Sequence, residues 1–166
     1  GKEALAAVGS VGSVVNMLVG LCAGLSTGAS VIISQCYGAH DNARLHDAVH
    51  TTIALTFLLC IAATVVGLAM VPLMLDLMAT PADVIELSRE YLNIYFAGIT
   101  GLLIYNMGSG ILRAVGDSRR PLYFLCVSAL TNIVLDLVFV VAFEWGVAGV
   151  AYATIISQFA SAVLVL

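Results

Sequence analysis

Residues 131–136 place an amide and a carboxylate inside strongly apolar sequence, and they read Thr131-Asn132-Ile133-Val134-Leu135-Asp136. The surrounding apolar run, from about residue 121 to residue 143, is long enough to cross a bilayer as one helix. Asn132 and Asp136 are four residues apart, so they share one helical face, which Ser128 extends. Because an acid inside a membrane span is costly and usually faces a cavity, a partner or an ion, the stretch predicts a functional carboxylate. A structural hydrogen-bonding role between helices is the alternative.

The composition is that of a membrane protein. Hydrophobic residues make up 61% of the chain and charged residues 10%, with a mean hydropathy of +1.09, whereas soluble domains carry about 25% charged residues. The formal net charge is −4, and without a basic stripe to neutralise phosphates no nucleic-acid partner is expected. The four cysteines occur singly in apolar segments and predict neither a disulfide framework nor a zinc site.

Apolar runs and turn residues divide the chain into five helical spans, near residues 5–37, 45–72, 81–115, 121–143 and 147–166. The second span is predicted to end at Pro72, and the third to begin at Pro81 with Thr80 as its N-cap and Asp83 as a capping acid. The prediction is an all-α, polytopic membrane protein with very short loops. Both ends of the sequence lie in helical segments, so we expect a piece of a longer protein.

Charged residues predict the orientation of the spans. Arginines cluster in the first and third turns (Arg44, Arg113, Arg119 and Arg120), whereas acidic residues dominate the second and fourth turns (Asp76, Asp83, Glu86, Glu90 and Glu144). Because positively charged loops stay in the cytoplasm, the first and third turns are predicted to be cytoplasmic.

Two adjacent spans are predicted to bring oxygen ligands to one depth. Asp136 precedes Trp145 by nine residues and Thr154 follows it by nine, so both are expected roughly 13 Å below the outer turn at about 1.5 Å per residue. Asn132 lies one turn deeper, level with Gln158. A carboxylate, an amide oxygen and a hydroxyl suit a sodium ion, and the same carboxylate can instead carry a proton.

Other polar residues are weaker candidates. Aromatic and amide side chains of the third span line a substrate cavity for organic cations or form interhelical hydrogen bonds, and both interpretations stay open. With residues of the next two spans, the candidate cavity set is Asn93, Tyr105, Asn106, Ser128 and Gln158.

Two further patterns are best explained by structure. His46 and His50 have metal-chelating spacing, but they flank the first turn, which favours an interfacial position without metal. Gly20, Gly24 and Gly28 form a small-residue stripe that predicts close helix packing. No nucleophile–base arrangement is present, so an enzyme is not predicted.

Several ordered motifs resemble those of the multidrug and toxic compound extrusion (MATE) transporters. They are residues 4–9, the glycine-rich run ending at residues 34–39, residues 110–121, Asn132-Ile133-Val134-Leu135-Asp136 and residues 146–154. The resemblance implies twelve helices in two six-helix lobes around a central cleft. It assigns this chain to helices two to six of the N-terminal lobe, without the first helix and the C-terminal lobe.

The same resemblance implies a site and a function. Relatives use an Asn and an Asp of the fifth helix and a Thr of the sixth, which correspond to Asn132, Asp136 and Thr154, together with an acid of the first helix that this chain lacks. The implied activity is export of organic cations from the cell through the plasma membrane, by alternating access, in exchange for sodium or protons and with no other cofactor. A lipid-linked sugar flippase of the same superfamily and a non-transporting membrane assembly module are the alternatives.

Overall fold

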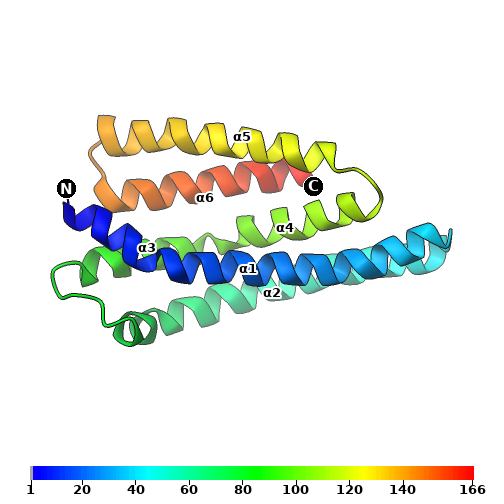
Figure 1. Ribbon diagram of the computed structural model, residues 1–166, viewed down its shortest axis with the longest axis horizontal. Helices are drawn as coiled ribbons and strands as arrows, with labels where there is room; N and C mark the ends of the chain where they lie inside the picture. Colours follow the sequence, from blue (N-terminus) through cyan, green and yellow to red (C-terminus); the bar gives the residue numbers. More distant parts are fainter. Residues whose placement is uncertain (1) are drawn as a thin grey trace.

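The computed structural model describes residues 2–166, so Gly1 lies outside the described part. The described chain is helical, as predicted, with short connections (Figure 1). Its elements are α1 (Lys2–Gly38), α2 (Asn42–Leu77), α3 (Ile85–Ala97), α4 (Ile99–Ala114), α5 (Arg119–Asp136), the π-helix η1 (Leu137–Ala142) and α6 (Gly146–Val165).

The predicted five spans correspond to four long apolar helices and one broken span. The α3–α4 pair bends by 48° at Gly98 and meets the requirements of a membrane span only when taken together. The prediction of an unbroken helix here was wrong. Gly98 allows the break because it packs against Ile155 of α6, where any Cβ atom would overlap the isoleucine side chain.

Two predicted helix ends also differ from the structure. α2 continues past Pro72 to Leu77, since membrane helices tolerate the lost backbone hydrogen bond when the rest of the helix is well packed. α3 begins at Ile85 and not at Pro81, because residues 82–84 form turns. Thr80 is therefore not an N-cap, and its hydroxyl is buried without a hydrogen-bond partner in the described chain.

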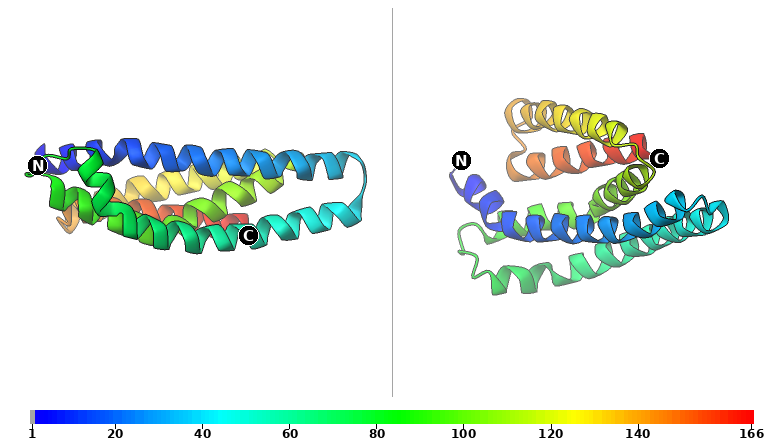
Figure 2. Two further views of the ribbon diagram at one scale, coloured as in Figure 1. Left: turned by 90° about the horizontal axis from the view of Figure 1, so that it is seen from below. Right: turned by 45° about the vertical axis from the view of Figure 1, so that its right-hand side comes forward.

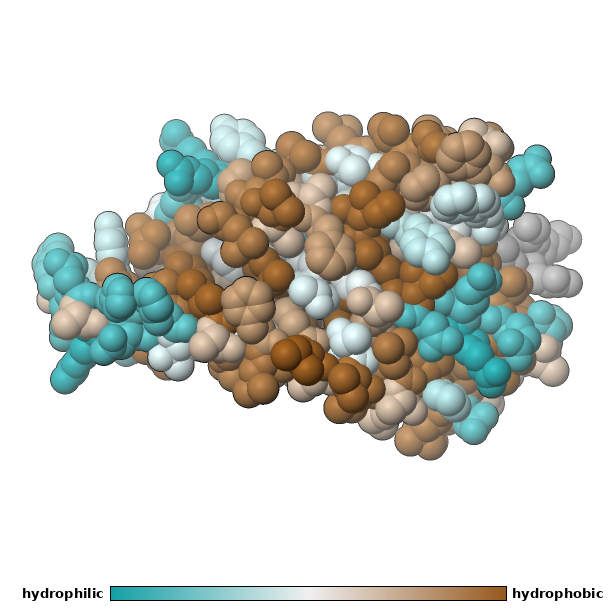
Figure 3. Space-filling model, turned by 180° about the vertical axis from the view of Figure 1, so that it is seen from behind, coloured by the Kyte–Doolittle hydropathy of each residue, from teal (hydrophilic) through white to brown (hydrophobic). Residues whose placement is uncertain are grey.

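The helices form layers. The α1–α2 pair lies on one side, the α5–α6 hairpin on the other, and α3 and α4 lie between them (Figures 1 and 2). The first and third turns are at one end of the molecule and the second and fourth at the other, as five alternating spans require. The face shown in Figure 3 is apolar around the middle and polar toward both ends. Leu58, Ile61 and Leu130 are each more than 60% exposed, which is the expected state of lipid-facing side chains.

Small residues bring α1 against α4. Ser26 donates a 2.6 Å hydrogen bond to the main-chain oxygen of Asn106, and Ser30 donates a 3.0 Å bond to that of Gly110. A Cβ atom at Gly110 would overlap the Ser26 hydroxyl, so only glycine permits this approach.

The predicted packing stripe on α1 faces another direction. A Cβ atom at Gly20, Gly24 or Gly28 would meet nothing within 4 Å in the described chain. The stripe lines an apolar groove of about 750 Å³ between α1 and α2. Its predicted helix partner is therefore not among the helices described.

Candidate functional site

Asp136 is the last residue of α5 before the π-helix. Its side chain is half-buried, and one carboxylate oxygen, Oδ1, is fully buried without a hydrogen-bond partner among the described residues. Buried polar atoms are nearly always paired, because an unpaired one loses its hydration without compensation. This oxygen is therefore a candidate ligand for a proton or a cation.

The π-helix that follows was not predicted. Phe143 N–H donates a 3.0 Å bond to the Val138 oxygen five residues earlier, the spacing that widens a helix turn. The wider turn directs Phe139 onto α6, where its Cβ atom would lie 3.1 Å from a Cβ atom at Gly149. The Phe139 ring also stacks on Trp145 with 5.0 Å between ring centroids. Aromatic packing at the outer turn thus holds the helix end next to Asp136.

Two contacts define the register of α5 against α6. Ser128 Oγ donates a 2.7 Å hydrogen bond to the Ser157 oxygen, and Phe139 packs against Gly149 nearer the turn. Counting from these pairs in the antiparallel hairpin places Asp136 opposite residues 149–152. The Thr154 backbone is then two to five residues deeper, about 3–8 Å at 1.5 Å per residue. Counted in this way, the two backbones are offset from the predicted equal depth, because the π-helix and the turn use more residues on the α5 side, and the shared site stays a prediction.

Side-chain direction reduces this offset. Helical side chains lean toward the N-terminus of their own helix, and α5 and α6 run in opposite directions. The Asp136 side chain therefore leans inward and that of Thr154 leans outward, so the two lean toward each other. Thr154 Oγ1 donates a 2.9 Å bond to the Val150 oxygen, which fixes this outward rotamer. Asn132, half-buried on the Asp136 face, lies opposite Thr154.

Tyr91 of α3 is a further candidate for the site, which the sequence did not indicate. Its side chain is 6% exposed, makes a polar contact with Thr154 and lies within electrostatic reach of Asp136. The Thr154 hydroxyl donates to Val150, so its oxygen lone pairs can accept from the Tyr91 O–H. The available signal was the Tyr91–Tyr95 pair at helical spacing, but only the fold shows that this face meets α6.

The next turn inward carries a second group of candidate residues. Gln158 follows Thr154 by one turn of α6 and has a buried, unpaired Oε1 atom among the described residues, and Ser128 of α5 donates to the adjacent Ser157 oxygen. Ser128 and Gln158 therefore lie on the inner side of the Asp136 site.

The structure does not bring the remaining cavity candidates to this place. Tyr105 O–H donates a 2.9 Å bond to the Pro121 oxygen, which joins α4 to the start of α5. The Asn106 amide nitrogen donates to the Leu102 oxygen within α4 at 2.8 Å. Asn93 is exposed and lines an outer groove of about 410 Å³ with Tyr152 and others. A substrate-binding role for these residues stays a prediction.

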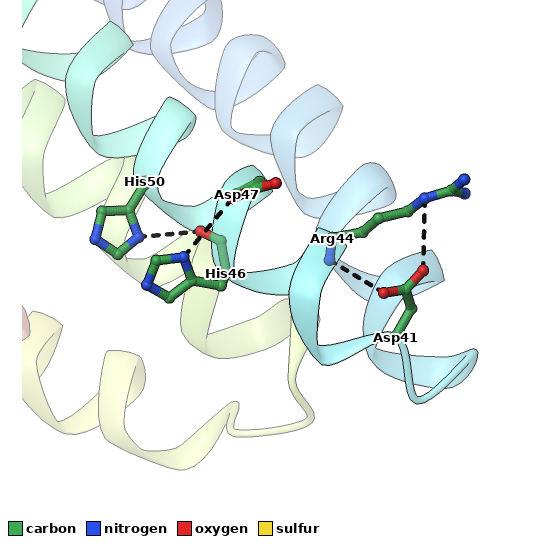
Figure 4. A network of polar contacts seen from close by, with 5 residues as sticks. All are labelled: Asp41, Arg44, His46, Asp47 and His50. Carbon is green, nitrogen blue, oxygen red and sulfur yellow. Dashed lines mark hydrogen bonds and ion pairs between the residues drawn. The ribbon is translucent and has the colours of Figure 1, made fainter.

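His46 and His50 are exposed and lie near the start of α2, beside the α1–α2 turn (Figure 4). His50 Nδ1 is 3.0 Å from the His46 oxygen, and His46 Nδ1 is 3.7 Å from an Asp47 oxygen. Asp41 caps α2 by accepting the Arg44 backbone N–H at 3.1 Å. Within residues 2–166 no three His, Cys, Asp or Glu side chains group as a metal site would require.

Comparison with known proteins finds a matching family model and several relatives. The MatE family model matches residues 1–138. The chain is 37% identical over 165 residues to the probable multidrug resistance protein YoeA of Bacillus subtilis (strain 168), covering 97% of this chain and 36% of that protein. It is 35% identical over 158 residues to the probable multidrug resistance protein YpnP of the same organism, covering 95% of this chain and 36% of the relative.

Solved structures share the fold. An inward-facing multidrug resistance MATE family transporter of the MOP superfamily superimposes with a TM-score of 0.93 at 32% identity, covering 99% of this chain and 38% of that one. The corresponding outward-facing structure also gives a TM-score of 0.93 at 32% identity, covering 99% of this chain and 37% of that one. The chain thus spans little more than a third of the length of these proteins.

Proposed function

This chain belongs to the MatE family, and we propose that the full-length transporter containing it exports organic cations from the cell through the plasma membrane, in exchange for sodium ions or protons. The chain supplies five spans of the N-terminal lobe. The observation that carries the proposal is the buried, unpartnered Oδ1 of Asp136 in a membrane helix, beside Tyr91 and Thr154. A structural acid would be expected to have its oxygens paired with neighbouring helices.

The ion site we propose consists of the Asp136 carboxylate, the Asn132 amide oxygen and the Thr154 hydroxyl, with Tyr91 as a fourth oxygen. Sodium binds such oxygen sets, and a proton on Asp136 neutralises the same charge. In either case the ion removes the cost of an ionised carboxylate in a poorly hydrated place.

Alternating access is supported by the behaviour of related lobes. This chain superimposes equally well on inward-facing and outward-facing structures, which is expected if the lobe keeps its internal shape while the two lobes rock. Ion binding at Asp136 then drives export by favouring one arrangement of the lobes, since an ion with equal affinity for both would shift nothing.

Charge distribution supports a cationic substrate. The arginines of the first and third turns, Arg44, Arg113, Arg119 and Arg120, are exposed at the end of the molecule that we assign to the cytoplasm. Asp136 lies near the opposite end, close to Tyr91 and to the aromatic packing of Phe139 on Trp145. An anionic headgroup, as in a lipid-linked sugar flippase, would favour arginines beside this site.

The decisive experiment uses the full-length transporter in proteoliposomes. Efflux of a fluorescent organic cation is driven by an imposed sodium gradient or by an imposed pH gradient, for wild type and for Asp136→Asn. We expect gradient-driven efflux to be lost in Asp136→Asn and retained in the matched control Asp76→Asn, whose carboxylate is exposed at the end of α2.

Each result has a defined meaning. The gradient that drives the wild-type protein identifies the coupling ion. Gradient-driven efflux that persists in Asp136→Asn would reduce this carboxylate to a structural role. Transport of lipid-linked sugar without export of the cation would favour the flippase, and absence of both activities from the wild-type protein would favour the assembly module.

A further inference from the structure

His46 and His50 hold their imidazole rings beside each other on the surface of α2. The ring centroids are 4.0 Å apart, and the ring planes are tilted by 31°. Both side chains are exposed, so neither ring is needed to fill the interior of the described chain. Figure 4 shows the two rings on the same side of the helix. The four-residue spacing, which by itself favours only an interfacial position, thus produces a pair of adjacent nitrogen ligands.

Contacts at Nδ1 leave the other ring nitrogen of each histidine available to a metal. His50 Nδ1 lies 3.0 Å from the His46 main-chain oxygen, which can only accept, so this nitrogen carries the proton. His46 Nδ1 lies 3.7 Å from an Asp47 carboxylate oxygen, which favours the same tautomer. In a neutral ring protonated at Nδ1, the lone pair is on Nε2. Metal-binding histidines are usually oriented in this way, by a carbonyl or a carboxylate at the second nitrogen.

The separation of the rings suits a single metal ion. Bonds from zinc to imidazole nitrogen are about 2.0–2.1 Å long, so one ion can join nitrogens that are up to about 4 Å apart. The 4.0 Å between the ring centroids is at this limit, and a small rotation of either exposed ring brings the Nε2 atoms closer. Asp47, whose side chain is 86% exposed, adds a negative charge beside the ion.

We propose that His46 and His50 chelate a divalent transition-metal ion of the zinc, nickel or copper class through their Nε2 atoms. Imidazole nitrogen suits these ions, whereas magnesium and calcium prefer oxygen. A site built from protein alone would require a third ligand, and within residues 2–166 no third His, Cys, Asp or Glu side chain joins the pair. Water therefore completes the coordination, as in metal sites that keep open positions. The site lies at the end of the molecule opposite to Asp136 and does not depend on the proposed ion coupling.

Copper(II) is the probe, because electron paramagnetic resonance detects the nitrogen atoms that are bound to it. One equivalent of Cu²⁺ is added to the full-length transporter, without an affinity tag, for wild type, His46→Asn and His50→Asn. We expect a two-imidazole signal from the wild-type protein that either substitution removes. The apparent Kd should rise at least about tenfold, since loss of even an outer-shell partner of a metal ligand costs 10–100-fold in affinity. His40→Asn is the matched control, because His40 is exposed in the same α1–α2 turn but is not one of the pair.

Two results would overturn the inference. One is a wild-type protein that binds Cu²⁺ through a single imidazole or none, a measurement that requires no variant. The other is a two-imidazole signal that survives in His46→Asn or His50→Asn, which would place the ion elsewhere in the transporter. Thermal unfolding checks that the variants are folded, since substitutions of exposed side chains should change stability little. Efflux by Asp136→Asn bears on the proposed function alone and leaves the copper signal unchanged.

Discussion

Ser128 of α5 donates a 2.7 Å hydrogen bond to the main-chain oxygen of Ser157 on α6, and this bond sets the depth at which the two helices present their polar groups. A depth estimated from the sequence alone counts residues from the turn at Trp145. The Ser128–Ser157 bond instead fixes the register of the two helices inside the lobe, and it places Asn132 opposite Thr154 and Asp136 nearer the turn.

Removing this bond should therefore affect both stability and ion binding. We expect Ser128→Ala in the full-length transporter to lower the free energy of unfolding by about 1 kcal/mol, the net value of one buried hydrogen bond. Thermal unfolding in detergent measures this loss. Ser34→Ala is the control, since the exposed Ser34 binds only the Val31 oxygen of its own helix. Equal unfolding temperatures for the two variants would show that the bond does not hold the register.

Tyr91 offers a test of the site that leaves the carboxylate in place. Tyr91→Phe keeps the ring that stacks on Tyr95 but removes the hydroxyl that contacts Thr154. We expect the concentration of coupling ion that gives half-maximal efflux to rise by about 10- to 100-fold, since a hydrogen bond at a charged site is worth about 1.5–3 kcal/mol. Tyr152→Phe, on an exposed tyrosine of α6, should leave it unchanged. The same increase in both variants would remove Tyr91 from the site.

Much of the fold follows from local sequence signals. The five spans, the turn at Asp117 and the pairing of α5 with α6 depend on apolar length and turn residues, which act within a few positions. Asp136 and Thr154 could be selected because a buried charge is rare and the hairpin is short. These features can be predicted from the sequence because each depends on the bilayer or on residues close by in the chain.

The features that were missed depend on tertiary contacts. Gly98 breaks the third span because Ile155 of α6 packs against it, and glycine occurs in many unbroken membrane helices. The π-helix after Asp136 forms because Phe139 packs on Gly149 and Trp145, and no local pattern predicts that contact. Tyr91 joins the site only because α3 meets α6. In each case a decisive partner lies on another helix, α6.

The α1–α4 contact predicts a strong steric effect at one glycine. Gly110→Ala introduces a Cβ atom that overlaps the Ser26 hydroxyl, and we expect a loss of about 1–3 kcal/mol in the free energy of unfolding, with Gly110→Val worse. Ser26→Ala removes the overlapping atom, so the double variant should be more stable than the sum of the two single losses. Strict additivity in thermal unfolding would show that α1 and α4 are not in contact through these atoms.

Gly149 connects the π-helix to ion coupling. A Cβ atom there would lie 3.1 Å from that of Phe139 and 3.2 Å from that of Trp145, distances that require small shifts of both aromatic residues. Gly149→Ala should therefore weaken coupling-ion binding slightly, and Gly149→Val should weaken it severely, because the larger side chain pushes Phe139 and the turn after Asp136 away from α6. The matched control is Ala148→Val, a half-buried neighbour outside this contact. Ion-dependent efflux, corrected for the amount of folded protein in the membrane, measures the effect. If Gly149→Val lowers protein abundance but leaves the ion dependence of the surviving protein unchanged, the π-helix contributes to folding and not to the geometry of Asp136.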